Sequence, residues 1–453
     1  MHEQLISSDK KRIVVGLGKT GLACARWLYR QGLPFFVVDT RTNPPGLDAL
    51  RDACPGVDII CGSLESDLLS QADELIVSPG LSLKEPTIAQ AIANGVAVSG
   101  DIELFCRQVE APVIAITGSN GKSTVTTLVG LMAEKAGVSV GVGGNIGTPV
   151  LDLLEQGEKD LYVLELSSFQ LETTHSLRAA AATVLNVTPD HMDRYDSLAE
   201  YHQAKHRIYC GCTGAVVNRD DALSSPLVSE NVRLVSFGLN QAPGLNDFGT
   251  VKENGKTWLV QGLKRLISTD ELKVRGSHNQ ANALAALALG TLARLPMEAM
   301  LEALREFTGL PHRCEWVKDA HDVNWFNDSK ATNTGSAIAA IEGLSSDITG
   351  QIVLIAGGDG KGADFSEMKP AVQSHVRDLI VIGVDGPRLG SEVEGAAPIH
   401  KAESLDEAIL TAKELAQSGD VVLLAPACAS FDMFDNYEHR GEMFRERVEV
   451  LCG

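Results

Sequence analysis

The sequence predicts an α/β protein with three domains, each built around a mostly parallel sheet. One pattern, a β-branched strand followed by a glycine-rich turn and an Ala/Leu-rich helix, begins at Arg12, Val113 and Ile352. The length of 453 residues agrees with three domains of roughly 150 residues each. Aromatic residues make up 5% and glycine occurs 43 times, which favours aliphatic strands with glycine turns over an aromatic-rich β-sandwich.

The first domain is predicted to span residues 1–100, the second 101–309 and the third 310–453, after the turn Thr308–Pro311. Each expected strand ends at a turn or a polar loop. Further strands are expected at Phe35–Asp39, Leu75–Ser78, Ala97–Ser99, Tyr162–Leu166, Thr183–Asn186, Val232–Phe237, Thr257–Val260, Asn324–Asn327, Leu379–Ile382 and Val421–Leu424.

Composition excludes several classes of protein. The net charge of −20 argues against a broad nucleic-acid-binding surface. The most apolar stretch, Ala283–Leu295, is too short to span a membrane and is expected to continue into an acidic helix. Nine cysteines form no CxxC pair, and Met1–Gln4 does not resemble the start of a signal peptide. We therefore expect a cytoplasmic protein that does not bind membranes.

The first glycine loop, Gly16–Gly21, is a complete GxGxxG between a strand and a helix. Asp39 ends the next strand, and Arg41 follows two residues later. Such a loop turns backbone N–H groups and a helix N-terminus toward a pyrophosphate. It is compatible with NAD, with NADP through Arg41, or with a turn that only packs a helix closely on its sheet.

The second loop, Thr117–Thr124, ends in the Gly-Lys-Ser of a P-loop. Its amides would cradle phosphates, Lys122 would reach the terminal ones and Ser123 would bind Mg²⁺. Ile116 stands where the usual pattern has its first glycine. The strand before the loop and the helix after it favour an NTP site over an accidental turn.

Polar residues follow other strands of the second domain. Glu165 ends an apolar strand and is either a cation ligand or a half-exposed strand-end residue. The loop Asp190–Arg194 concentrates Asp, His and Arg, which favours a site, although acidic turns with a solvated histidine are also common. By pattern alone Lys205 is a surface lysine, and the polar face His278–Asn282 usually only caps a helix.

Three loops of the third domain lie at the carboxyl ends of strands, where open α/β sheets bind ligands. Lys330 and Lys361 would supply positive charge there in an otherwise acidic protein. The loops are Asn327–Asn333, Gly357–Gly362 and Pro426–Ser430.

Together these segments resemble the Mur ligase family of ATP-dependent amino-acid ligases over nearly the whole chain. Folylpolyglutamate synthetases share the shortened phosphate loop. More specific to the Mur ligases are Gly16–Gly21, Glu165–Glu172, His191–Tyr195, Asn327–Asn333, Gly357–Lys361 and Pro426–Phe431.

The resemblance implies an N-terminal Rossmann-like domain, a central P-loop-type ATPase domain and a C-terminal Rossmann-like domain. It implies a carbon–nitrogen ligase that uses ATP and Mg²⁺ to add D-glutamate to UDP-N-acetylmuramoyl-L-alanine in peptidoglycan precursor synthesis. The GxGxxG loop would then hold the pyrophosphate of UDP. A monomer is expected.

The resemblance also implies roles for individual residues. Lys122, His191 and a carbamylated Lys205 would be catalytic, and Ser123, Glu165, His191 and Lys205 would hold the metal. ATP would contact Gly118, Ser119, Asn120, Gly121, Lys122, Ser123, Thr124, Asn279, Asn282, Arg313 and Asp328. The UDP substrate would contact Lys19, Thr20, Thr40, Arg41, Gly80, Asn145 and Ser167, and D-glutamate would contact Lys330, Thr332, Lys361, Ser430 and Tyr437.

Two positions depart from the family's pattern. The link from His191 to Lys205 is one residue shorter than expected, and Tyr437 stands where phenylalanine is expected. Alternative functions are a sister ligase for a different amino acid, an NAD(P)-dependent oxidoreductase, and a nucleotide-driven binding module without ligase chemistry.

Overall fold

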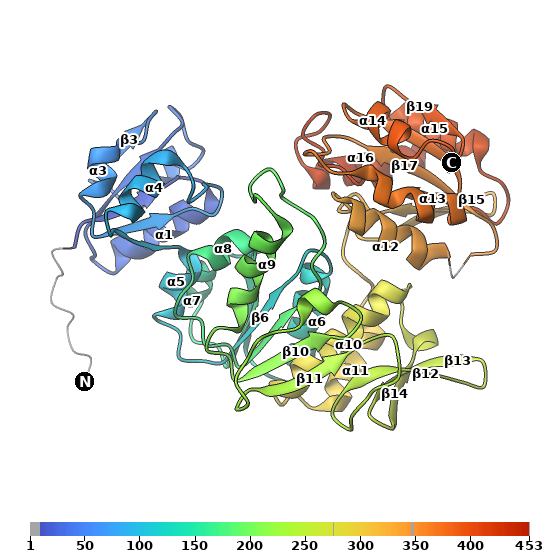
Figure 1. The fold of residues 1–453 in the computed structure, drawn as a ribbon, viewed down its shortest axis with the longest axis horizontal. Coiled ribbons are helices and arrows are strands. Elements are labelled where there is room, and N and C mark those ends of the chain that lie inside the picture. Colours follow the sequence, from blue (N-terminus) through green and yellow to red (C-terminus); the bar gives the residue numbers. More distant parts are fainter. Residues whose placement is uncertain (1–9, 275, 346–347, 453) are drawn as a thin grey trace.

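The computed structural model describes residues 10–274, 276–345 and 348–452; Met1–Gln4 and Arg275 lie outside the described residues. Within this part of the chain the strands form four sheets. Figure 1 shows three bodies: the N-terminal one in blue, the central one in cyan to yellow, and the C-terminal one in orange and red. The N-terminal and C-terminal bodies are both attached to the central one and lie apart from each other in this view.

The N-terminal sheet is parallel throughout. Its central strand continues into the GxGxxG turn and then into helix α1, as the sequence predicts. The strands, in spatial order, are β3 (Ile59–Cys61), β2 (Phe35–Asp39), β1 (Arg12–Val15), β4 (Glu74–Val77) and β5 (Ala97–Ser99). The helices are α1 (Lys19–Arg30), α2 (Leu47–Ala53), α3 (Ser66–Ser70) and α4 (Pro86–Ala93).

The central parallel sheet places the P-loop strand β6 between β8, which ends at Glu165, and β9, which is followed by the loop that carries His191. Its order is β11 (Arg233–Phe237), β10 (Gly214–Asn218), β9 (Ala181–Val184), β6 (Val113–Thr117), β8 (Leu161–Glu165) and β7 (Val140–Gly144). An antiparallel sheet of β12 (Phe248–Glu253), β13 (Lys256–Gln261) and β14 (Lys264–Ser268) follows in the chain.

The helices of the central body surround this sheet. They are α5 (Asp101–Cys106), α6 (Lys122–Lys135), α7 (Val150–Glu155), α8 (Ser168–Glu172), α9 (Leu198–His206), α10 (Ser277–Leu292) and α11 (Met297–Glu306). The expectation that the apolar stretch Ala283–Leu295 continues directly into an acidic helix is wrong, because α10 ends at Leu292 and Pro296 caps the separate helix α11. Among the described residues, no helix is long and apolar enough to cross a membrane.

The C-terminal sheet is parallel except for its first strand. Its order is β15 (Glu315–Ala320), β16 (Val323–Asn327), β20 (Val421–Leu424), β17 (Ile352–Gly357), β18 (Val376–Ile382) and β19 (Ile399–Lys401). The helices are α12 (Thr334–Ser345), α13 (Lys369–His375), α14 (Gly386–Glu392), α15 (Leu405–Leu415) and α16 (Tyr437–Leu451). The domain boundaries at residues 100 and 309 remain predictions.

The N-terminal body is fixed to the central one by a shared apolar core and by polar contacts. One buried cluster runs from Val14 and Leu28 through Phe105 to Leu164. Around it, the Arg26 guanidinium lies 3.0 Å from an Asp152 carboxylate oxygen, and Lys84 pairs with Asp196 and Glu200, each at 2.9 Å. Burial of apolar surface is the larger contribution, because exposed ion pairs contribute little.

Candidate active site

The P-loop lies at the carboxyl end of β6 and opens helix α6. Gly121 has φ +81°, and a Cβ there would approach the Asn282 Oδ1 atom of α10 to 2.5 Å. Only glycine therefore permits this close approach between the loop and α10. The first backbone N–H groups of α6 are directed at the place where the phosphates of a nucleotide would lie.

The segment that follows β9 holds the P-loop in place through hydrogen bonds. The Asn120 amide donates to Asn186 Oδ1 at 2.8 Å, and the Ser119 amide donates to the Asn186 carbonyl at 2.9 Å. The Ser119 hydroxyl donates to the Thr188 carbonyl at 2.9 Å. These bonds hold the loop in shape before any nucleotide binds, which reduces the ordering cost of binding.

Lys122 folds back over its own loop. Its Nζ donates to the Gly118 carbonyl at 2.9 Å and to the Ser119 carbonyl at 2.8 Å. Burial lowers the pKa of this lysine, and the charge of Arg313 lowers it further. A polyphosphate would replace two neutral acceptors with anionic ones, which form stronger hydrogen bonds with an ammonium group.

A cavity of about 270 Å³ lies beside the P-loop and brings together predicted site residues from two domains. The central domain contributes most of the lining and the C-terminal domain contributes one edge. The predicted residues among those that line it are Ser119, Asn120, Lys122, Ser123, Asn145, Glu165, Ser167, His191, Lys205, Arg313, Lys330 and Thr332.

Glu165 is only 2% exposed, so the half-exposed strand-end interpretation is wrong. Asn145 Nδ2 donates to its Oε1 atom at 2.8 Å, whereas Oε2 is buried and has no hydrogen-bond partner among the described residues. A buried carboxylate oxygen without a partner is costly. A cation in the adjoining cavity would satisfy it.

His191 lies in a loop whose backbone is strained. Its φ of +56° is in the left-handed region, which is uncommon for a residue with a side chain. Its amide donates to Asp190 Oδ1 at 2.9 Å, and its ring packs edge-on against Phe169 with centroids 4.9 Å apart. Burial lowers the pKa of His191, while Asp190 opposes that effect. A neutral imidazole is the form that binds a metal.

The interpretation of Lys205 as a surface lysine is wrong. Lys205 is only 2% exposed. Its Nζ donates to the Gly118 carbonyl at 2.9 Å and lies 4.4 Å from the centroid of the Tyr201 ring. Burial lowers the pKa of Lys205 well below that of a free lysine, and the charge of Lys122 lowers it further. The sequence pattern of α9 did not predict that Lys205 is buried, because the face of the helix that lines the cavity is polar.

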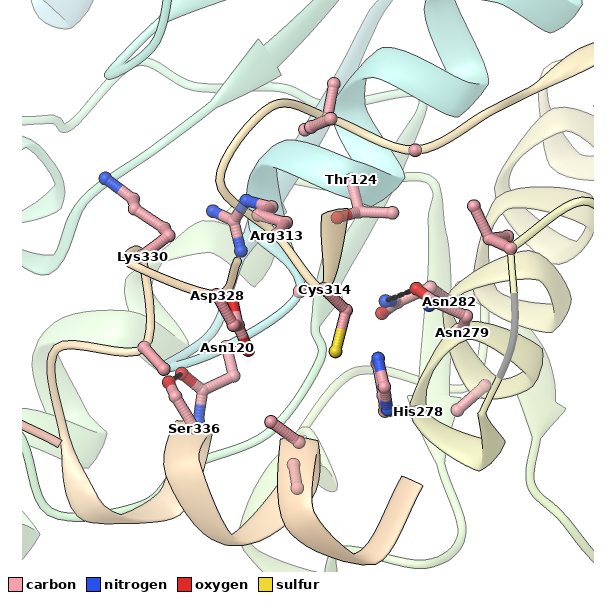
Figure 2. Close-up of a pocket in the computed structure, with 18 of the residues that line it drawn as sticks. Asn120, Thr124, His278, Asn279, Asn282, Arg313, Cys314, Asp328, Lys330 and Ser336 are labelled. Carbon is pink, nitrogen blue, oxygen red and sulfur yellow. Dashed lines mark hydrogen bonds between the residues drawn. The ribbon is translucent and has the colours of Figure 1, made fainter. Parts of the chain in front are cut away.

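A second cavity, of about 530 Å³, lies between α10 and the start of the C-terminal domain. Figure 2 shows Asn279 and Asn282 of α10 on one side, with Arg313, Cys314 and Asp328 opposite them. An Arg313 Nη donates to the Ser123 hydroxyl at 2.9 Å, so this cavity is continuous with the P-loop. Burial raises the pKa of Asp328 to about 7, against the opposing charge of Arg313.

Helix α12 connects the C-terminal domain to the P-loop. The Ser336 hydroxyl donates to Asn120 Oδ1, a bond drawn in Figure 2. Asn333 Nδ2 donates to Asp190 Oδ2 at 3.2 Å. The C-terminal domain is therefore in direct contact with both the phosphate loop and the segment that carries His191.

Of the predicted D-glutamate contacts, Lys330 and Thr332 line the edge of the first cavity, and Tyr437 contacts Lys330. The Lys330 ammonium is 3.6 Å from the centroid of the Tyr437 ring, and burial lowers the pKa of Lys330 to about 8. Tyrosine provides the same aromatic face that the expected phenylalanine would. Lys361, Ser430 and Tyr437 are not among the residues that line this cavity.

Sequence reasoning missed Arg440. This arginine is 1% exposed, and its guanidinium donates to the carbonyls of Ser329 at 2.8 Å and Cys428 at 3.1 Å. Its Nε donates to the Ser329 hydroxyl, which itself donates to the Tyr437 carbonyl. It fixes the loops of Lys330 and Ser430 relative to each other. Nothing in its helical surroundings distinguishes it from a surface arginine.

In the N-terminal domain, both carboxylate oxygens of Asp39 already accept hydrogen bonds. Its Oδ2 accepts from the Leu17 amide at 2.6 Å and from Arg41 Nη2 at 2.7 Å, and its Oδ1 accepts from Arg41 Nε at 2.8 Å. Arg41 and Thr40 are exposed at the end of β2, as is Gly80 after β4. Lys19 reaches across to the central domain, where its Nζ donates to the Gly147 carbonyl at 2.8 Å.

Family models match most of the chain. A model of the MurD-like N-terminal domain of Mur ligases matches residues 10–100, a model of the Mur ligase middle domain matches 116–290, and a model of the Mur ligase glutamate ligase domain matches 312–428. The fold and the P-loop site therefore define a Mur ligase, an ATP-dependent ligase that forms amide bonds. The chain belongs to the Mur ligase family.

Individual relatives are similar over their whole length. The UDP-N-acetylmuramoylalanine--D-glutamate ligase of Pseudomonas aeruginosa is 56% identical over 448 residues, covering 99% of this chain and 100% of the relative. That of Pseudomonas putida is 56% identical over 452 residues, covering 100% of both. Among solved structures, the Thermotoga maritima UDP-N-acetylmuramate-alanine ligase superposes with a TM-score of 0.59 at 20% identity, covering 98% of this chain and 100% of that one. That likeness concerns the fold alone.

Proposed function

We propose that this protein is the ATP-dependent ligase that joins D-glutamate to UDP-N-acetylmuramoyl-L-alanine in peptidoglycan precursor synthesis. The observation that carries the proposal is the cavity of about 270 Å³, where the P-loop, Glu165, His191 and Lys205 meet Lys330 and Thr332 of the C-terminal domain. Full-length relatives at 56% identity carry the name of that activity.

The first step is phosphoryl transfer. A carboxylate oxygen of UDP-N-acetylmuramoyl-L-alanine attacks the γ-phosphorus of ATP, the bond to the β-phosphate oxygen breaks, and ADP leaves. Lys122 and Arg313 neutralise charge on the phosphates, and Asn279, Asn282 and Asp328 line the side of the cavity proposed for the nucleoside. The product is an acyl phosphate.

The second step forms the amide. The amine of D-glutamate attacks the acyl carbon, loses a proton, and inorganic phosphate leaves the tetrahedral intermediate. We place this amine beside Lys330 and Thr332, which line the edge of the cavity, and place Lys361, Ser430 and Tyr437 around the rest of D-glutamate; Tyr437 contacts Lys330. Asn333, just before α12, contacts Asp190, and Ser336 of α12 contacts Asn120; these contacts help to exclude water, which would hydrolyse the acyl phosphate.

The cavity also fits Mg²⁺. The unpaired Oε2 of Glu165, the Ser123 hydroxyl and the His191 imidazole are suitable donors that line it. Among the described residues, no three His, Cys, Asp or Glu side chains are arranged to hold a metal by themselves. When bound, Mg²⁺ would polarise phosphoryl oxygens and offset their charge.

We further propose that Lys205 is carbamylated and completes this ligand set. Carbamylation joins CO₂ to an uncharged amine, and burial keeps the Lys205 pKa low enough for that form to exist. The carbamate is an anionic oxygen donor, the kind that Mg²⁺ prefers. It would stand beside Gly118 in the cavity that Glu165 and His191 also line.

The N-terminal domain is proposed to bind the UDP moiety through Lys19, Thr20, Thr40, Arg41 and Gly80, with Asn145 and Ser167 near the muramoyl-alanine end. We also propose that the protein acts as a cytoplasmic monomer. Its nine cysteines are all free in the structure, which supports a reducing compartment.

Arg41→Ala is expected to raise the KM for the UDP substrate about tenfold while leaving the KM for ATP within about twofold. The reason is that Arg41 is half-exposed beside the glycine loop and far along the chain from the P-loop. Steady-state phosphate release with each substrate varied in turn measures both constants. Equal changes for the two substrates would contradict the placement of UDP.

The activity itself is tested by asking which amino acid triggers phosphate release. Purified protein with ATP and Mg²⁺ should release phosphate only when UDP-N-acetylmuramoyl-L-alanine and D-glutamate are both present. Release with L-glutamate, or with another amino acid in competition, would instead indicate a sister ligase. ATP turnover that is indifferent to every amino acid would indicate a binding module.

A further inference from the structure

Arg194 lies at the junction of the N-terminal and central domains and is not among the predicted site residues. Its two Nη groups donate to the carbonyls of Pro79 at 2.6 Å and Leu81 at 2.7 Å. These carbonyls flank Gly80, which is proposed to contact the UDP substrate. The Arg194 side chain is only 13% exposed, so both bonds are largely shielded from water.

The Arg194 side chain also approaches the surroundings of His191. The Arg194 guanidinium lies 3.8 Å from the centroid of the Phe169 ring, and the His191 ring packs edge-on against the same phenylalanine at 4.9 Å. The main-chain amide of Arg194 donates to the His191 carbonyl at 2.9 Å, which places Arg194 in the turn directly after His191; this bond does not depend on the arginine side chain. The Arg194 side chain therefore reaches His191 through their shared aromatic neighbour, Phe169.

The Gly80 loop is in turn bonded to the GxGxxG loop. The Ser78 hydroxyl donates to the Gly16 carbonyl at 2.8 Å, and the Leu81 amide donates to the Ser78 carbonyl at 3.0 Å. Contacts are thus continuous from the proposed pyrophosphate loop, through Arg194 and Phe169, to His191.

We propose that Arg194 is a positioning residue that couples the seating of the UDP substrate in the N-terminal domain to the placement of His191 beside the reacting carboxylate. This inference rests on the proposed function, since it takes the glycine loop as the UDP site. Small displacements of a reacting group lower turnover strongly, so the loss of this link acts on kcat as well as on binding.

Arg207 provides a matched control. Its Nε donates to the Leu171 carbonyl at 2.7 Å and its Nη2 to the Thr174 carbonyl at 2.8 Å, so it also holds two backbone carbonyls. Both acceptors belong to the central domain, whereas those of Arg194 belong to the N-terminal domain. The two arginines differ in what they connect rather than in how many carbonyls they bind.

The test compares steady-state kinetics of Arg194→Ala, Arg194→Lys and Arg207→Ala, with phosphate release first shown to need D-glutamate in the parent protein. Arg194→Ala should lower kcat about tenfold and raise the KM for the UDP substrate about fivefold, with the KM for ATP within about twofold. Arg194→Lys, which keeps a cation and a donor, should recover part of kcat. Arg207→Ala should leave every constant within about twofold.

Phe169→Leu tests the contact between Arg194 and the surroundings of His191 separately from the carbonyl bonds of Arg194. It also replaces Arg194→Ala in the test if that variant does not fold. It keeps the carbonyl bonds of Arg194 but removes the ring shared with His191, so kcat should fall while the KM for the UDP substrate stays within about twofold. Parent-like constants in Arg194→Ala, or equal losses in Arg207→Ala, would overturn the proposal. A parent protein that ignores D-glutamate would refute the proposed function first, and the inference with it.

Discussion

Replacing Lys205 with alanine is expected to lower ligase turnover by more than about a hundredfold, because the variant loses the proposed carbamate. Short carboxylates such as formate or acetate should restore part of the rate by occupying the space left beside Gly118. Phosphate release measured with increasing acetate checks both effects. Removal of bicarbonate and CO₂ from the buffer should slow the parent protein in the same way.

Lys135→Ala is the control for this experiment. Lys135 ends helix α6 and pairs with Glu302 and Glu306 far from the cavity, at 3.0 and 2.7 Å. Its replacement should leave both turnover and the response to acetate unchanged. Undiminished turnover in Lys205→Ala would dispose of the carbamate proposal, and a large loss without any rescue would leave Lys205 as an ordinary cationic contact.

Glu165→Gln is expected to lower ligase turnover without lowering the stability of the protein. The amide keeps an oxygen for the Asn145 bond but removes the buried anionic oxygen that has no partner among the described residues. Turnover should fall about a hundredfold or more, while the thermal unfolding midpoint of the metal-free protein should stay the same or rise. The rise in that midpoint caused by Mg²⁺ with a nucleotide should shrink.

Glu103→Gln is the matched control because Glu103 is also 2% exposed and lies in the central domain. Its carboxylate accepts from the His175 and Ser176 amides at 2.7 and 2.8 Å and from Arg107 at 3.0 Å, so it is fully engaged. This variant should lower the unfolding midpoint and leave the Mg²⁺ response intact. If Glu165→Gln behaved in the same way, Glu165 would be structural rather than a metal ligand.

Much of the fold could be predicted because its signals are local. The loops that begin at Gly16 and Gly118 each follow an apolar strand and open a helix, and the structure has both. The strands β12 and β14 and the break between α10 and α11 were not predicted. Their sequences are short or half-exposed, and their geometry depends on packing partners that lie elsewhere in the chain.

The site was only partly visible in the sequence for a related reason. From the sequence, Lys205 and Arg440 are expected at the surface, because charged side chains are normally exposed to water. Only the folded structure shows that both are buried. The resemblance to Mur ligases supplied the role of Lys205, whereas no signal pointed to Arg440. Arg194 stood out only as part of a loop dense in polar residues.

The N-terminal domain, with its parallel sheet and GxGxxG loop, resembles a domain that binds nicotinamide dinucleotides. Such a cofactor would need the Asp39 carboxylate for its ribose, yet that carboxylate already accepts from the Leu17 amide and from Arg41. A ribose at this position would have to displace Arg41, which is half-exposed, from the buried Asp39 carboxylate and would also compete with the Leu17 amide. The glycine motif is thus one that is typical of dinucleotide sites, while the carboxylate that would bind the ribose of NAD is already held by this chain's own groups.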